Sequence, residues 1–453
     1  MSGWNGRRVL VVGLGVSGFA AARALIELGA QVRVTEGGSN DGIEKRARDL
    51  RDLGAEVEVG GHDLDSVDAD IAVVSPGIPP TSSVLLALRE RDVRVIGEVE
   101  LAYQLGDCDF LAVTGTNGKT TTTSLLGEML RHGGVDSMVG GNIGTPLIDA
   151  VLSLPSSGAV AVEVSSFQLA TIEEFRPRVA VILNVAEDHT DWHGTFQSYV
   201  SAKKRIFENQ SGDDVVLVNA DDPVAASLAV DAPARVVPFS GRGVPEGGAG
   251  LRDGALVVRG TVVAGVEDIS LAGAAGAEDS VAAAAMAFEY GVTPKAIASA
   301  LREFKPLPHR LEAIAEVDGV TYIDDSKATN PHATISAVRG LSDVVLIAGG
   351  RSKGIDLSPL ADLVPQVTAV IALGEAKDEL ARLFEGIARV VVVDSMGDAV
   401  HAAHEEANGK GSVLLSPGCA SLDMYSSYVA RGKDFSAEVR KLANLERGTN
   451  GHS

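Results

Sequence analysis

The chain is poor in cysteine, in aromatic residues and in positive charge. Cys108 and Cys419 are the only cysteines among 453 residues, which excludes a disulfide framework or a cysteine-based metal cluster. Aromatic residues make up 4% of the chain, so Val, Ala, Leu and Ile must fill its cores. The 61 acidic and 39 basic residues give a formal net charge of -22. This charge argues against a general nucleic-acid binder, whose surface must be basic to hold phosphates.

Long apolar segments are also missing. No uninterrupted apolar run is long enough to cross a bilayer. Residues 1–8 lack the apolar region and the cleavage site of a signal peptide. We therefore expect a soluble, cytoplasmic protein without membrane insertion, in which both cysteines stay reduced.

A β-branched run, a glycine-containing or polar turn and a helical stretch recur along the chain. Continuous apolar strands that alternate with helices indicate parallel sheets in α/β domains. The expected strands are Val9–Val12, Ile71–Val74, Phe110–Val113, Val160–Val164, Val179–Leu183, Gly319–Ile323, Val344–Ile347, Val367–Leu373 and Ser412–Leu415.

The length predicts between two and four domains, and the pattern divides the chain into three. The first, residues 1–105, opens with a glycine-rich turn typical of dinucleotide sites. The second, residues 106–306, ends where two prolines interrupt the segment Phe304–Pro308. The third covers residues 307–453. Within the second domain, the Gly- and Ala-rich segment Ser240–Ala277 is expected to form short strands and loops.

The strongest motif is the loop Gly115-Thr116-Asn117-Gly118-Lys119-Thr120, between an expected strand and the expected helix Thr121–Arg131. The backbone N–H groups of such a turn and the helix N-terminus form a cradle for phosphates. Lys119 can reach the outer phosphates, and the Thr120 hydroxyl can bind Mg²⁺. Val113 stands where the full pattern has a glycine, so the loop is a shortened variant. A chance glycine-rich turn is the alternative, but the Gly-Lys-Thr ending argues against it.

A second glycine motif, Gly13-Leu14-Gly15-Val16-Ser17-Gly18, follows the first expected strand, and Glu36 ends the next one. This pattern predicts a bound dinucleotide with Glu36 on a ribose, as in an NAD-dependent dehydrogenase. The motif itself requires only a diphosphate near a helix N-terminus. A nucleotide diphosphate attached to a sugar therefore fits the motif as well as a dinucleotide does. The phosphate loop downstream favours the second interpretation, because a dehydrogenase has no need of one.

Three polar residues of the second domain are candidates for metal or phosphate binding. Glu163 ends a strand and could hold Mg²⁺, although a solvated glutamate that caps a helix is an equal alternative. His189, in the segment Asn184–His189, could bind a metal or lie against a phosphate. Lys203 lies in Ser201-Ala202-Lys203-Lys204-Arg205, a pattern that by itself favours a solvated basic helix face.

Polar turns also follow the expected strands of the third domain. Asp325 and Lys327 lie in the dense polar segment Asp324–Pro331, where Lys327 could hold a carboxylate or phosphate and Asp325 a metal or ribose. The segments Gly349–Gly354 and Ser416–Ser421 are further turns at strand ends. Each could be a simple surface turn, but their joint placement predicts a shared cleft.

These segments resemble the Mur ligases of peptidoglycan synthesis over nearly the whole chain. The resemblance rests on Thr114–Thr120, Gly140–Gly144, Asn184–His189, His309-Arg310 and Asp325–Asn330. The segments Glu163–Leu169, Leu307–Glu312 and Ser416–Asp423 resemble the members of the family that add D-glutamate. The resemblance implies a Rossmann-like first domain, a central domain like a P-loop ATPase and a Rossmann-like third domain.

The implied activity is ATP-dependent amide bond formation, which adds D-glutamate to UDP-N-acetylmuramoyl-L-alanine through an acyl phosphate. The implied cofactors are ATP and two Mg²⁺, and the enzyme is expected to act as a monomer. The alternatives are a sibling ligase for another amino acid, the NAD-dependent dehydrogenase and a nucleotide-binding regulator without chemistry.

The resemblance also implies a role for single residues. The implied catalytic residues are Lys119, Glu163, His189 and Lys203. The implied metal ligands are Thr120, Glu163, His189 and Lys203, and Lys203 would bind the metal as a carbamate formed with CO₂. The ATP-binding residues are Gly115, Thr116, Asn117, Gly118, Lys119, Thr120, Thr121, Asp279, Arg310, Asp325 and Lys327. The uridine nucleotide contacts Val16, Ser17, Glu36 and Gly77, Asn142 contacts substrate or phosphate, and D-glutamate contacts Thr329, Lys353, Ser421, Leu422 and Tyr428.

The chain departs from the family pattern at two of these positions. Many members carry a His-Asn-x-x-Asn run that touches the adenine, whereas this chain has Ala277–Val281, with Asp279 near the second Asn. The contacts to adenine must therefore differ. Tyr428 takes the place of a phenylalanine in the glutamate pocket.

Overall fold

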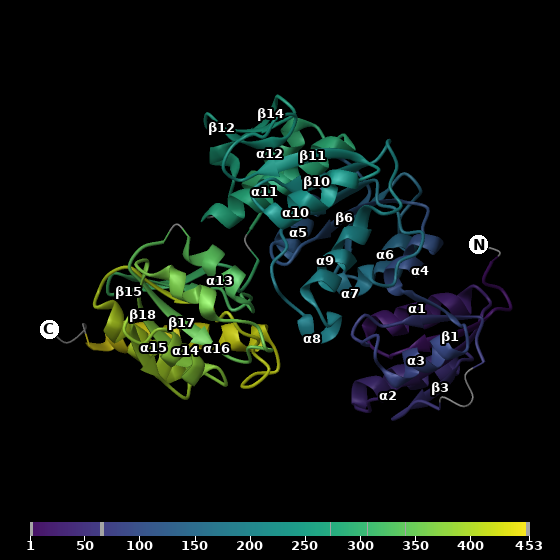
Figure 1. Cartoon of the computed structure of the whole chain (residues 1–453), viewed down its shortest axis with the longest axis horizontal. Helices are drawn as coiled ribbons and strands as arrows, with labels where there is room; N and C mark the ends of the chain where they lie inside the picture. Colours follow the sequence, from purple (N-terminus) through teal and green to yellow (C-terminus); the bar gives the residue numbers. More distant parts are fainter. Residues whose placement is uncertain (1–2, 64–67, 272, 306, 340, 450–453) are drawn as a thin grey trace. The chain divides into compact units, whose positions relative to one another are not determined.

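The computed structural model describes residues 3–63, 68–271, 273–305, 307–339 and 341–449. Two compact units can be distinguished by their internal contacts (Figure 1). The first comprises Met1–Val185, Trp192–Asp268 and Asp279–Arg302. The second comprises Ala186–Asp191, Ile269–Glu278 and Glu303–Ser453.

The first sheet of the first unit is parallel throughout, with the strand order β3-β2-β1-β4-β5 among the described residues. The strand order reverses between β1 and β4, so the turns after these two strands open at the same edge of the sheet. Its strands are β1 (Arg8–Val12), β2 (Gln31–Glu36), β3 (Glu56–Val59), β4 (Ile71–Val74) and β5 (Arg94–Gly97), and its helices α1 (Val16–Glu27), α2 (Asp41–Asp52) and α3 (Ser83–Glu90).

Helix α4 (Glu98–Leu105) joins the first sheet to the second through two buried glutamates. One carboxylate oxygen of Glu100 accepts hydrogen bonds from the backbone amides of Glu173, Glu174 and Phe175, at 2.8–3.0 Å. Glu98 accepts a bond from the amide of Leu147, and burial raises the pKa of its carboxyl. These hydrogen bonds fasten α4 to the start of α6 and to the segment that precedes β9.

The second sheet has the order β14-β13-β12-β11-β10-β9-β6-β8-β7 among the described residues, and only the pairs β12–β13 and β13–β14 are antiparallel. Strand β6 lies between β8 and β9, so the segments that follow these three strands are neighbours. The strands are β6 (Asp109–Thr114), β7 (Ser137–Gly141), β8 (Ala159–Glu163), β9 (Val179–Ile182), β10 (Val215–Asn219), β11 (Arg235–Ser240), β12 (Ala249–Arg252), β13 (Ala255–Val258) and β14 (Thr261–Gly265).

Helices alternate with the strands along this part of the chain. They are α5 (Lys119–His132), α6 (Leu147–Ser153), α7 (Ser166–Leu169), α8 (Thr190–His193), α9 (Phe196–Lys204), α10 (Pro223–Leu228), α11 (Gly273–Tyr290) and α12 (Pro294–Glu303). Short 3₁₀ helices cover Arg205–Phe207, Ala229–Asp231 and Val266–Asp268.

The sheet of the second unit has the order β15-β16-β20-β17-β18-β19 among the described residues, with only β15 antiparallel. Because β16, β20 and β17 are neighbours, the loops that follow them share one edge. The strands are β15 (Glu312–Val317), β16 (Val320–Asp324), β17 (Val344–Gly349), β18 (Val367–Leu373), β19 (Arg389–Val392) and β20 (Ser412–Leu415). The helices are α13 (Pro331–Val338), α14 (Lys377–Leu383), α15 (Met396–Ala407) and α16 (Tyr428–Thr449), with a 3₁₀ helix at Ser358–Leu363.

The expected α/β fold and all nine expected strands are confirmed, with ends shifted by one or two residues. The expectation for Ser240–Ala277 is right for β12, β13 and β14 but wrong at its end, where α11 begins at Gly273. Alanine is the best helix former, and α11 is buried around much of its circumference, so it shows no amphipathic period. Pro306, at the expected second boundary, lies outside the described residues. Among those residues, no helix is both long and apolar enough to cross a membrane.

Candidate active site

The phosphate loop joins β6 to α5 as the sequence predicts. Gly118, directly before α5, has a φ of 81°, a left-handed conformation that favours glycine. A Cβ atom at Gly118 would lie 2.2 Å from the Oδ1 atom of Asp279, so the loop also needs glycine for lack of space. Asp279, predicted to be an ATP-binding residue, therefore packs directly against the loop.

Two lysine side chains meet at this loop. The Nζ atom of Lys119 donates to the carbonyl oxygens of Gly115 and Thr116, at 2.9 Å each. The Nζ atom of Lys203 donates to the same Gly115 oxygen at 2.7 Å, and its residue is only 1% exposed. The solvated helix face that the local pattern favoured for Lys203 is therefore wrong, because α9 packs this side of the helix against the phosphate loop.

Tyr199 connects α9 to the phosphate loop. Its hydroxyl lies 2.9 Å from the Thr116 hydroxyl, and the Lys203 ammonium lies 4.5 Å from its ring centroid. The sequence analysis missed Tyr199. Its position four residues before Lys203 could have indicated it, since residues at this spacing share one face of a helix.

Asn184, which follows β9, also holds the phosphate loop through hydrogen bonds. The backbone carbonyl of Asn184 accepts a bond from the Thr116 amide at 2.9 Å. Its side-chain oxygen accepts a bond from the Asn117 amide at 2.8 Å. The carbonyl and side-chain oxygens of this one residue thus hold two amides of the loop.

Glu163 ends β8 and is 2% exposed. Its Oε1 atom accepts a bond from the Asn142 side chain at 2.7 Å, while Oε2 is buried and has no hydrogen-bond partner among the described residues. The alternative of a solvated helix cap is wrong, since Ser165 caps α7. A buried carboxylate oxygen without a partner is costly, so it points to a missing positive group such as a cation.

His189 belongs to the segment Ala186–Asp191, which is part of the second unit. Its backbone is left-handed, with a φ of 54°, and its amide donates to the neighbouring Asp188 carboxylate at 2.9 Å. Asp188 is buried, accepts a bond from the Asn330 side chain at 3.3 Å and lies 3.9 Å from the Lys353 ammonium. The structure therefore brings Asp188 to Lys353, whereas the metal role of His189 stays a prediction.

The glycine turn of the first sheet is built as a cradle. A Cβ atom at Gly18 would lie 2.0 Å from the Gly13 carbonyl oxygen, so only glycine allows this approach of α1 to β1. The Glu36 carboxylate accepts bonds from the amides of Leu14 at 2.6 Å and Gly38 at 2.7 Å. Val16 is exposed at the start of α1. The predicted residues Val16, Ser17 and Glu36 thus surround one helix N-terminus.

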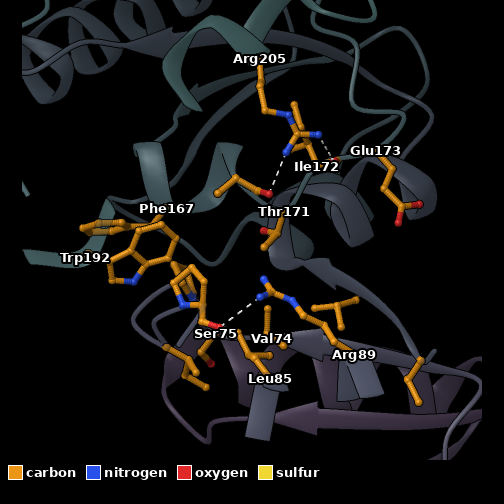
Figure 2. Close-up of a pocket in the computed structure, with 16 residues that line it drawn as sticks. Val74, Ser75, Leu85, Arg89, Phe167, Thr171, Ile172, Glu173, Trp192 and Arg205 are labelled. Carbon is orange, nitrogen blue, oxygen red and sulfur yellow. Dashed lines mark hydrogen bonds between the residues drawn. The ribbon is translucent and has the colours of Figure 1, made fainter. Parts of the chain in front are cut away.

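A cavity of about 370 Å³ begins at Ser75 and Pro76, beside the predicted substrate residue Gly77 (Figure 2). Its walls are mainly apolar and come from β4, α3 and β5 on one side and from α7 and the segment after it on the other. Phe167 and Trp192 pack together with ring centroids 4.8 Å apart. Arg205 at its rim donates to the carbonyl oxygens of Leu169, Ala170 and Ile172. The cavity and the predicted residue Gly77 both belong to the first unit.

In the second unit, Asp325 is buried at the end of β16 and accepts a bond from the Ser416 hydroxyl at 2.8 Å. Burial raises the pKa of the Asp325 carboxyl to about 7, although the Ser416 bond and the charge of Arg310 act in the opposite direction. The Lys327 ammonium lies 4.0 Å from the ring centroid of Tyr428. The structure thus places Lys327, which was predicted to bind ATP, beside Tyr428, which was predicted to bind D-glutamate.

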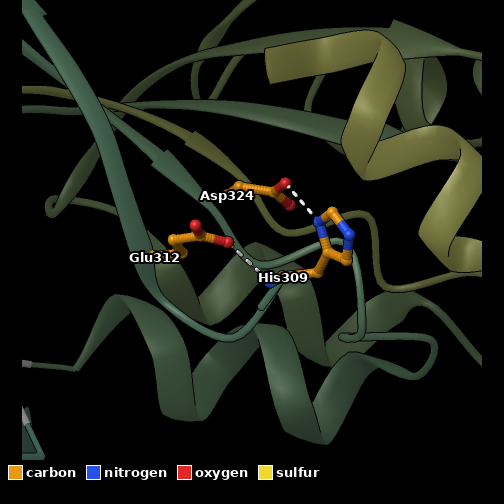
Figure 3. Close-up of side chains that lie close together, drawn as sticks. All are labelled: His309, Glu312 and Asp324. Carbon is orange, nitrogen blue, oxygen red and sulfur yellow. Dashed lines mark hydrogen bonds and ion pairs between the residues drawn. The ribbon is translucent and has the colours of Figure 1, made fainter. Parts of the chain in front are cut away.

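His309, Glu312 and Asp324 form a compact cluster (Figure 3). The Nδ1 atom of His309 lies 2.7 Å from Asp324 Oδ2, and its backbone amide donates to Glu312 at 2.9 Å. The backbone carbonyl of His309 accepts a bond from the Lys327 amide at 3.2 Å. These bonds anchor the segment that carries Arg310. The sequence analysis assigned no role to Asp324 or Glu312.

The structure defines a nucleotide-binding enzyme of the α/β class, with a phosphate loop and a buried carboxylate at adjacent strand ends. Models of three Mur ligase domains match the chain: the MurD-like N-terminal domain over residues 7–97, the middle domain over 113–246 and the glutamate ligase domain over 309–419. The chain therefore belongs to the Mur ligase family, as its motifs suggested.

Individual relatives agree with this assignment. The UDP-N-acetylmuramoylalanine–D-glutamate ligase of Caldanaerobacter subterraneus is 40% identical, over 96% of this chain and 98% of the relative. The protein of the same name from Frankia casuarinae is 44% identical, over 96% and 94%. The crystal structure of UDP-N-acetylmuramate–alanine ligase from Thermotoga maritima shares the fold, with a TM-score of 0.59, 18% identity and coverage of 96% and 99%.

The geometry of the loop predicts that Gly118→Ala weakens ADP binding about tenfold or more, because the new methyl group displaces Asp279 and strains a loop that must follow the phosphates. Gly134→Ala is the matched control, since Gly134 is also left-handed, with a φ of 74°, but has open space around it. Calorimetric titration with ADP measures both variants. Equal affinities would contradict the packing of the loop against Asp279.

Proposed function

We propose that the chain catalyses the ATP-dependent addition of D-glutamate to UDP-N-acetylmuramoyl-L-alanine. The meeting of Lys119 and Lys203 at the phosphate loop carries the proposal, because it is built to receive transferable phosphate. Relatives at 40% and 44% identity over nearly their full length bear the name of this activity. We further propose that the enzyme acts as a monomer in the cytoplasm, in the synthesis of peptidoglycan precursors.

The reaction needs an activated carboxyl group, because amide formation from a carboxylate and an amine is uphill in water. A carboxylate oxygen of the alanyl group attacks the γ-phosphorus of ATP, and ADP leaves. The amine of D-glutamate then attacks the carbonyl carbon of the acyl phosphate, loses a proton and expels phosphate. Lys119, held at the loop, neutralises charge on the transferring phosphoryl group.

The residues of the first unit fit a requirement for Mg²⁺. Within the part of the chain that the structure describes, the buried Oε2 atom of Glu163 has no hydrogen-bond partner, and a carboxylate oxygen is the type of ligand that Mg²⁺ prefers. In this unit, Glu163, Thr120 and a carbamate on Lys203 would hold Mg²⁺. When bound, Mg²⁺ neutralises negative charge on the phosphates and on the developing transition state.

A carbamate on Lys203 is supported by the charge pattern at the loop. Two ammonium groups that donate to one carbonyl oxygen repel each other, and burial of Lys203 strengthens the repulsion. The neutral amine of Lys203 can add to CO₂ with formation of an N–C bond and release of one proton. The product is an anion, which removes the repulsion and supplies oxygens for a metal.

The substrates are assigned by sheet. Val16, Ser17, Glu36 and Gly77 surround the turn of the first sheet and would hold the uridine diphosphate at the N-terminus of α1. Thr329, Lys353, Ser421, Leu422 and Tyr428 follow strands of the third sheet and would hold D-glutamate. A carboxylate of D-glutamate would replace Asp188 beside Lys353, which lies 3.9 Å from Asp188. Domains at residues 1–105, 106–306 and 307–453 would each carry one substrate.

Phosphate release in the presence of ATP, Mg²⁺ and UDP-N-acetylmuramoyl-L-alanine tests the proposal. We expect release that depends on added D-glutamate, because the amine of D-glutamate expels phosphate from the acyl phosphate. Release that responds instead to L-lysine or diaminopimelate would reassign the chain to a sibling activity. No release with any amino acid would refute the enzymatic function.

The carbamate predicts the behaviour of a lysine variant. Lys203→Ala should lose about 99% of the activity, and added acetate or propionate should restore part of it by replacing the carbamate oxygens. Lys204→Ala is the control, since Lys204 is the next residue on α9 and is not buried. Wild-type activity in the Lys203 variant would exclude the carbamate, as would a loss that no short carboxylate relieves.

A further inference from the structure

Arg431, in the first turn of α16, is the largest of the fully buried side chains of the structure. Its Nε atom donates to the Ser326 hydroxyl at 3.0 Å, and Nη2 donates to the Ser326 carbonyl oxygen at 2.8 Å. Its Nη1 atom donates to the carbonyl oxygens of Cys419 at 3.1 Å and Gly349 at 3.4 Å. All four acceptors are neutral oxygens.

The burial of a charged side chain such as Arg431 costs free energy, because the charge loses its hydration. Burial lowers the pKa of the Arg431 guanidinium to about 10, so the group still carries its charge at neutral pH. Among the described residues, no carboxylate forms an ion pair with it, although Asp324 and Asp423 act on it from a greater distance. An apolar side chain would fill the volume at lower cost. The guanidinium is distinguished by donors that point in several fixed directions within one plane.

The acceptors belong to three separate loops. Ser326 follows β16, Gly349 ends β17 and Cys419 follows β20, and these strands are neighbours in the sheet. Lys327 is adjacent to Ser326, and Lys353 and Ser421 follow Gly349 and Cys419 within a few residues. One side chain thus joins the three loops that carry the predicted ligand-binding groups.

The same contacts include the start of α16. The Ser326 hydroxyl accepts a bond from Arg431 and donates to the Tyr428 carbonyl oxygen at 2.8 Å. The Ser326 amide donates to Asp324, whose other oxygen lies 2.7 Å from His309 Nδ1. Ser326 therefore connects Arg431 to the segment that carries Arg310 and to the backbone of Tyr428.

We propose that Arg431 is a positioning residue, whose guanidinium holds the loops after β16, β17 and β20 in one arrangement, so that Lys327 is placed for ATP and Lys353 and Ser421 for D-glutamate. The inference rests on the proposed function, because that function assigns the ligand-binding groups of the loops. Arg431 itself contacts no substrate; it acts through the backbone of the three loops.

Kinetic measurements on the full chain test this role. We expect Arg431→Ala and Arg431→Lys to lower kcat/KM for D-glutamate about a hundredfold and about tenfold, since a single ammonium cannot reach all three loops and small displacements are costly. Guanidinium chloride at low millimolar concentration should restore about tenfold of the loss in Arg431→Ala and none in Arg431→Lys. Arg440→Ala, an exposed arginine of the same helix, should stay within about twofold of the wild type.

Amide hydrogen exchange of the ligand-free chain separates positioning from a general role in stability. We expect faster exchange in residues 325–330, 350–354 and 416–423 of the Arg431 variants, with unchanged exchange in β17 and β18. Equal acceleration throughout the unit, or a wild-type kcat/KM in Arg431→Lys, would overturn the proposal. If Arg431→Ala does not fold, Arg431→Lys carries both measurements. Exchange needs no substrate, so it stays decisive even if the wild type shows no D-glutamate-dependent activity, a result that would refute only the proposed function.

Discussion

Two ammonium groups, those of Lys119 and Lys203, donate to a single backbone oxygen, that of Gly115. Like charges come this close only where the surroundings hold them and an anion can compensate them. Strand β6 presents the carbonyl, α5 begins with Lys119, and α9 brings Lys203 and Tyr199 against the loop. Residues from β6, α5 and α9 thus bring both side chains to one point of the phosphate loop.

The two units use the carboxyl ends of parallel strands in the same way. In the second sheet, β6, β8 and β9 lie side by side and end in the phosphate loop, Glu163 and the segment with Asn184. In the third, β16, β20 and β17 end in the loops that Arg431 joins. Buried polar groups, namely Asn184 in one unit and Arg431 in the other, hold these loops through backbone atoms. Rigid strands thus supply position, and the loops supply chemistry.

The strands and the phosphate loop could be predicted from the sequence, because both depend on residues close together in the chain. Runs such as Val344–Ile347 indicate buried strands by themselves, and Gly118-Lys119-Thr120 carries its own geometry. Lys203 could not be placed in this way, since its burial depends on packing between α9 and a loop 88 residues away. The pairs of Asp188 with Lys353 and of His309 with Asp324 also depend on tertiary contacts. For Lys203, the local pattern predicted a solvated helix face, whereas the family resemblance predicted a metal ligand, a role that stays a prediction.

The transfer of an oxygen atom tests the account most directly. If the alanyl carboxylate of the substrate is labelled with oxygen-18, the acyl phosphate route moves one labelled oxygen into the released phosphate and leaves the other in the amide. We predict labelled phosphate that forms in equal amount with the amide product. Unlabelled phosphate would mean that water, and not the carboxylate, attacks ATP, and would contradict a ligase that works through an acyl phosphate at this loop.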